Sequence, residues 1–158
     1  MNFRFLLPGK IRENYIEEGS KEYMKRLSRF GKVSLAMLKE EPLPPSPSQK
    51  EIAAALKKEA ERNLRLIRDD EKVILFDVHG KEMDSASFAS SLKELTSRSG
   101  SLVFLFGSSY GIDECERRRA DLSVSLSKLT FTHTMAFLLA TEQVYRAMKI
   151  ASGETYDK

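Results

Sequence analysis

Residues 101–111 read SLVFLFGSSYG, an almost unbroken apolar run closed by glycine and small polar residues. Residues 72–80, KVILFDVHG, repeat this pattern. A strand with one face in water alternates apolar and polar residues, so continuous runs of this length indicate strands buried on both faces, as in a parallel sheet. Both segments are therefore predicted to be inner strands of such a sheet.

Strand and helix patterns alternate on either side of these two segments. The fold class predicted is α/β, with a mostly parallel sheet, helices on both sides and a single domain over residues 1–158. The last helix is apolar on most sides in its first turns and should be largely buried. Further strands are predicted at 2–7, 33–38 and 121–126, and helices at 11–30, 48–68, 85–98, 113–119 and 135–151.

The composition narrows the class of protein. With 158 residues and 41% hydrophobic content, the chain can bury one good core. Its single cysteine, Cys115, excludes a disulfide framework and fits a reducing cytoplasm. No apolar run approaches the ~18 residues that cross a membrane. His79 and His133 lack a second ligand at helical spacing, so we expect no metal site.

Positive charge is concentrated at the N-terminus. The first 32 residues hold eight Lys or Arg side chains against four Glu. Such a patch can meet RNA phosphates, or it can be an ordinary solvated helix face. The basic residues are Arg4, Lys10, Arg12, Lys21, Lys25, Arg26, Arg29 and Lys32.

Three strand ends carry unusual residues: FDVHG at 76–80, FGSSYG at 106–111 and SLSKLTF at 125–131. The carboxyl ends of parallel strands share one edge, where ligands bind in such sheets. Gly107 and Gly111 let the backbone approach a ligand, although a plain tight turn has the same composition. The segment matches neither a dinucleotide fingerprint nor a phosphate-binding loop, and no nucleophile elbow is present.

Four segments together resemble the RlmH family of SPOUT methyltransferases: LLPGKI (6–11), FGSSYG, SKLTFTHTM (127–135) and EQVYRAMKIASGETYDK (142–158). The resemblance spans the chain. It implies a homodimer with a C-terminal trefoil knot that uses S-adenosyl-L-methionine to methylate N3 of a pseudouridine in 23S rRNA, within the ribosome. A knotted passage after the fifth strand would explain the six Ser and Thr residues within 123–135.

The resemblance also implies site residues. On the acceptor side it points to Arg146, Tyr156, Asp157 and Lys158, where Arg146 or Lys158 can bind phosphate or stabilise the deprotonated base. Taken by itself, Arg146 also has the spacing of a helix ion pair with Glu142. For the donor pocket, the resemblance implies Phe76, Gly107, Leu126, Ser127, Lys128, Leu129, Thr130 and Phe131. The alternative for these residues is that they are simply buried core.

Three positions depart from the family pattern. Thr132 stands where proline is common, Ser108 where a second glycine is common, and Asp157 where histidine is common. The leading hypothesis is a methyltransferase that aligns the donor with the base and removes the N3 proton. An RNA-binding or ribosome assembly factor that no longer catalyses is the alternative. An unrelated nucleotide-binding module would explain the sheet but not the C-terminal match.

Overall fold

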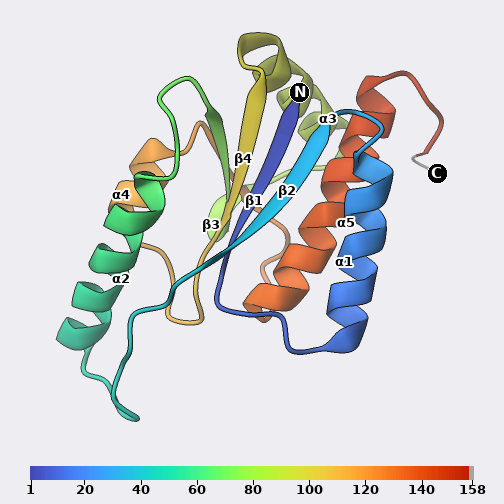
Figure 1. The fold of residues 1–158 in the computed structure, drawn as a ribbon. Coiled ribbons are helices and arrows are strands. Elements are labelled where there is room, and N and C mark those ends of the chain that lie inside the picture. The colour runs from blue at the N-terminus through green and yellow to red at the C-terminus, as the bar shows by residue number, and fades with distance from the viewer. Residues whose placement is uncertain (157–158) are drawn as a thin grey trace.

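The computed structural model describes residues 1–156 of the chain. Within them, one sheet runs in the order β2-β1-β4-β3-β5, and every neighbouring pair is parallel (Figure 1). This confirms the predicted parallel sheet. The strands are β1 (Asn2–Pro8), β2 (Lys32–Leu38), β3 (Lys72–Glu82), β4 (Ser101–Phe106) and β5 (Leu122–Ser125).

Helices cover both faces of the sheet. On one face, α5 (His133–Ala151) lies between α1 (Asn14–Leu27) and α3 (Ser85–Arg98). The end of α2 (Gln49–Leu64) and the short α4 (Glu114–Arg119) lie on the other face (Figure 1). No residue of α5 is fully exposed, which confirms that this helix is largely buried.

The core is divided by the sheet because successive side chains of a strand point to opposite faces. On the α5 side it is rich in phenylalanine: Phe5 stacks on Phe104 with ring centres 4.7 Å apart, and Phe137 of α5 meets Phe5 edge-on at 5.7 Å. On the α2 side, Val103 and Leu105 pack among other aliphatic side chains. All six residues of β4 are buried, as the continuous apolar run predicted.

Helix boundaries follow local capping. The Ser48 hydroxyl accepts a hydrogen bond from the Glu51 N–H, and the Glu51 carboxylate accepts one from the Ser48 N–H, so the predicted capping box begins α2. This helix ends at Leu64, four residues before the predicted end. The helix α5 begins at His133 because the Thr132 hydroxyl caps it, two residues earlier than expected.

Strand β3 is irregular where it meets β5. Phe76 and Lys81 both pair with Val124, so residues 77–80 form an outward bulge of the strand. At Gly80, a side-chain carbon would lie 2.7 Å from backbone atoms of Val124. Only glycine lets β3 pass so close to the end of β5.

No helix within residues 1–156 has the length and apolar character that crossing a membrane requires.

Candidate functional site

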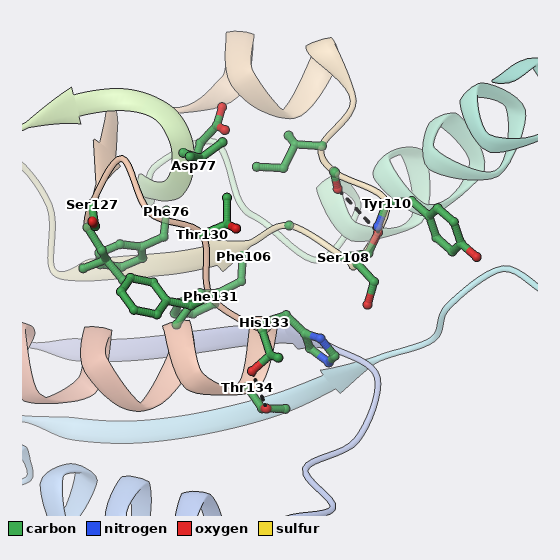
Figure 2. Close-up of a pocket in the computed structure, with 18 of the residues that line it drawn as sticks. Phe76, Asp77, Phe106, Ser108, Tyr110, Ser127, Thr130, Phe131, His133 and Thr134 are labelled. Carbon is green, nitrogen blue, oxygen red and sulfur yellow. Dashed lines mark hydrogen bonds between the residues drawn. The ribbon is translucent and has the colours of Figure 1, made fainter.

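A cavity of about 990 Å³ lies at the carboxyl edge of the sheet. Its walls come from residues 76–79 within β3, from the carboxyl ends of β4 and β5, from the segment between β5 and α5, and from the connection between β1 and α1. Figure 2 shows Phe76, Phe106, Thr130 and His133 around this space. The three strand ends singled out in the sequence therefore meet at one site.

The predicted donor residues are brought together here, with one exception. Phe76, Gly107, Leu126, Ser127, Leu129, Thr130 and Phe131 line the cavity, whereas Lys128 does not. Phe76 also belongs to the core, where its ring stacks on Phe106 with centres 5.1 Å apart. It is thus both a buried core residue and part of the cavity wall.

Hydroxyl groups hold the segment between β5 and α5. The Ser125 hydroxyl donates to the Ser127 carbonyl at 2.9 Å, and the Ser127 hydroxyl accepts from the Leu129 N–H at 3.0 Å. The Thr132 hydroxyl then caps α5. Small side chains replace the missing secondary-structure bonds here, because the chain is neither strand nor helix in this passage. This accounts for the unusual Ser and Thr content of residues 123–135.

The FGSSYG segment forms a tight turn on the opposite wall. Ser108 and Gly111 exchange two backbone hydrogen bonds, of 3.1 and 3.0 Å, and Gly111 has a φ of +115°. At Gly107, an added side-chain carbon would lie 2.6 Å from the Ile112 side chain. The two glycines therefore serve the turn itself, and the turn exposes the Gly107 backbone to the cavity.

An ion pair that the sequence did not reveal closes one end of the cavity. Arg117 Nε of α4 donates to Asp77 Oδ2 at 2.7 Å, and the His79 N–H donates to Asp77 Oδ1 at 3.1 Å. Burial raises the pKa of Asp77, but the hydrogen bonds from Arg117 and His79 outweigh it and leave the pKa below its ordinary value. No signal in the sequence indicated this ion pair, because its two residues are 40 positions apart and no repeating pattern relates them.

The acceptor residues lie elsewhere. The Arg146 guanidinium contacts Glu142 at 2.7 Å and stacks over the Tyr156 ring at 4.7 Å. Ala136 of α5 lines the cavity, and Arg146 is ten residues further along. At 1.5 Å per residue the offset is about 15 Å. Figure 1 shows α5 running from the strand-end edge toward the opposite edge. Asp157 and Lys158 lie outside the described residues.

Six of the eight basic N-terminal residues fall into two groups. Four are neutralised: Arg4 by Glu71, Lys21 by Glu17, Arg26 by Glu22 and Arg29 by Glu154. Lys10 and Arg12 line the cavity and form no ion pair within residues 1–156. The basic patch expected from composition is therefore half as large, and its cavity-lining members follow β1. Also within the described residues, no group of three metal-ligating side chains could hold an ion.

Comparison with known proteins places this fold in a family. The model of a family described as "Predicted SPOUT methyltransferase" matches residues 1–157. The chain belongs to the SPOUT methyltransferase family. A methyltransferase transfers a methyl group and therefore requires a methyl donor.

Relatives of this SPOUT chain are similar over their whole length. The ribosomal RNA large subunit methyltransferase H of Levilactobacillus brevis is 40% identical over 159 residues, and that of Latilactobacillus sakei is 37% identical; both alignments cover 100% of each chain. The resemblance to the RlmH family is thereby confirmed. A solved structure, a probable methylase family protein from Haemophilus influenzae, matches 99% of this chain and 70% of its own with a TM-score of 0.53. At 12% identity, that match supports the fold alone.

Proposed function

We propose that this chain methylates N3 of a pseudouridine in 23S rRNA, with S-adenosyl-L-methionine as the methyl donor. The observation that carries the proposal is the 40% identity, over the full length, to a ribosomal RNA large subunit methyltransferase H. Its site is the cavity where residues 126–131 meet the bulge of β3 and the end of β4. Because the substrate would be ribosomal RNA, we place the protein in the cytoplasm, as a single catalytic domain.

The cavity suits the adenosine part of the donor. Phe76, Leu126 and Phe131 give apolar walls on which an adenine ring can pack. The segment 126–131 has neither helical nor strand hydrogen bonding, so its backbone groups can read the edge of a base. When bound, the donor supplies a methyl group already activated by its positively charged sulfur. The residues of the chain then orient the donor in line with N3, exclude water and accept the proton that leaves N3.

On the acceptor side, Arg146 fits the stabilisation of negative charge. A guanidinium stabilises either a phosphate or a uracil-type ring that has lost its N3 proton. Glu142 and the Tyr156 ring hold Arg146 in place. A fixed guanidinium needs little reorganisation when charge develops on the base.

We further propose that the active site is completed in a homodimer. Within one chain, Arg146 lies about 15 Å along α5 from the cavity. A second copy can bring its own Arg146 to the cavity of the first. The trefoil knot is also part of this proposal: the close crossing of Gly80 and Val124 fits a chain that is threaded beside β3.

The test is methyl transfer to ribosomes that lack the modification. Ribosomes from a strain without its own methyltransferase are incubated with the purified protein and radiolabelled S-adenosyl-L-methionine, and the product is mapped by mass spectrometry of 23S rRNA. We expect one methyl group on one pseudouridine. Donor binding without transfer would favour the assembly factor instead, and no donor binding by a folded protein would exclude the methyltransferase.

A further inference from the structure

Two buried polar atoms have no hydrogen-bond partner within residues 1–156: Oε2 of Glu13 and Nε2 of His133. Both residues line the cavity at the strand ends. Buried polar atoms are nearly always paired, because an unpaired one has lost its bonds to water without replacement. Two such atoms in one cavity therefore indicate that a ligand supplies the missing partners.

The Glu13 side chain has no structural role among the described residues. It occupies the N-cap position of α1, yet its side chain caps nothing. The N-cap side chains of the other four helices, Ser48, Asp84, Asp113 and Thr132, each accept a hydrogen bond from their own helix. Nor does Glu13 form an ion pair among the described residues. Its carboxylate is available to the cavity.

Charges of both signs surround this end of the cavity. Lys10 and Arg12 come from the same connection as Glu13, and Glu40 follows β2. A purely anionic ligand such as a phosphate would be repelled by the two carboxylates. A ligand that carries an ammonium and a carboxylate side by side would be attracted by both sets of charges. The α-amino acid group of a methionine is of this class.

The separation of the two ends agrees with one elongated ligand. Glu13 follows β1, whereas Phe76 lies on β3, and β4 alone stands between these strands. Neighbouring strands are about 4.8 Å apart, so the two ends of the cavity are offset by about 10 Å. An adenosine at the β3 and β5 side leaves the attached methionine to extend toward β1.

We propose that Glu13 and His133 bind the amino acid half of the methyl donor. The Glu13 carboxylate accepts hydrogen bonds from the α-ammonium group, and Nε2 of His133 donates to the α-carboxylate, with Lys10 and Arg12 at the rim. This rests on the proposed donor and adds the residues that fix its orientation. Both are donor-binding residues, because they contact the amino acid group of the donor and not the transferred methyl group.

Two analogues separate this subsite from the adenosine pocket. S-adenosylhomocysteine carries the amino acid group, whereas methylthioadenosine has the adenosine and thioether without it. Calorimetry of both compounds is compared for the wild-type protein, Glu13→Gln, His133→Ala and the control Glu18→Gln, whose side chain is exposed on α1. We expect Glu13→Gln and His133→Ala each to weaken S-adenosylhomocysteine binding about tenfold or more, and to leave methylthioadenosine binding unchanged.

The outcomes distinguish the two proposals. If the wild-type protein binds neither analogue, the proposed function fails. If both analogues bind but the variants weaken both equally, or neither, the amino acid subsite is wrong. A variant that binds both analogues normally and raises only the KM for ribosomes would move Glu13 and His133 to the RNA side, which also overturns the subsite. Methylthioadenosine binding reports that each variant is folded.

Discussion

At the residue scale, the site depends on side chains whose partners come from distant parts of the sequence. The Asp77 side chain is 5% exposed and that of Arg117 is 33% exposed, so their ion pair is shielded on one side only. Asp77 lies in the bulge of β3, and Arg117 lies on α4, so the pair ties the helix to the part of the strand that forms the cavity wall. A partly buried pair of this kind contributes more than a surface pair.

Replacing Asp77 by Asn should lower the free energy of unfolding by about 2 kcal/mol at neutral pH, because the acceptor of the Arg117 hydrogen bond loses its charge. The pKa of Asp77 is lowered in the folded protein. Its stabilisation is therefore present above the pKa of the unfolded chain and lost as the pH falls through the folded pKa. Urea unfolding at several pH values should show the difference between variant and wild type shrinking in acid.

The control for that measurement is Asp70→Asn. Asp70 also contacts an arginine, Arg68 at 3.2 Å, but its side chain is 75% exposed. We expect a change of at most about 1 kcal/mol. Equal losses for Asp70→Asn and Asp77→Asn would mean that the pair at the cavity is worth no more than a surface contact.

The role of Asp157 in methyl transfer is tested by mutation. This residue lies outside the described residues, and the sequence resemblance places a histidine at its position in the family. A carboxylate beside Lys158 can accept the N3 proton or orient the base. We expect Asp157→Ala to lower kcat about tenfold or more in the ribosome assay, with donor affinity unchanged. Wild-type activity in Asp157→Ala would make the residue a bystander. Activity restricted to Asp157→His would indicate a natural binding factor.

At the element scale, the sequence predicted the strands and the shared edge of the site because both follow from repeating patterns. The buried runs at 72–80 and 101–111 are visible as continuous apolar letters, and parallel pairing then places their ends together. The contacts of Asp77 with Arg117 and the approach of Glu13 to the cavity were not predictable. They depend on side-chain directions in loops and helix ends, which no periodic pattern encodes.

The crossing of β3 and β5 gives an element-scale prediction. Gly80→Ala would place a side-chain carbon 2.7 Å from the Val124 backbone, which is part of β5 and not the end of a flexible side chain. We expect a loss of about 3 kcal/mol in the free energy of unfolding and weaker donor binding. Gly100→Ala is the matched control, since no atom lies within 4 Å of its added carbon. It should change stability by less than about 1 kcal/mol. Similar unfolding curves for both variants would contradict the crowded crossing.

At the scale of the whole molecule, α5 separates the cavity from the acceptor residues. Its first turn lines the cavity, and Arg146 with Tyr156 gathers at the other end, beside Tyr145. The sequence resemblance named donor-side and acceptor-side residues but gave no distance between the two sets. If the chain acts as the proposed homodimer, each active site combines the cavity of one subunit with Arg146 of the other.

Subunit mixing tests this arrangement. Arg146→Ala should bind the donor like wild type and transfer no methyl group, whereas Gly107→Val should lose the donor, because even its first side-chain carbon would meet Ile112 at 2.6 Å. When the two inactive proteins are mixed and exchange subunits, half of the dimers are mixed. In each of these, one site joins the intact cavity of the Arg146→Ala chain to the intact Arg146 of its partner. Activity should return to about one quarter of the wild-type level. If Arg146 instead serves the cavity of its own chain, both sites of every mixed dimer are defective, and the mixture stays inactive although light scattering shows that dimers form.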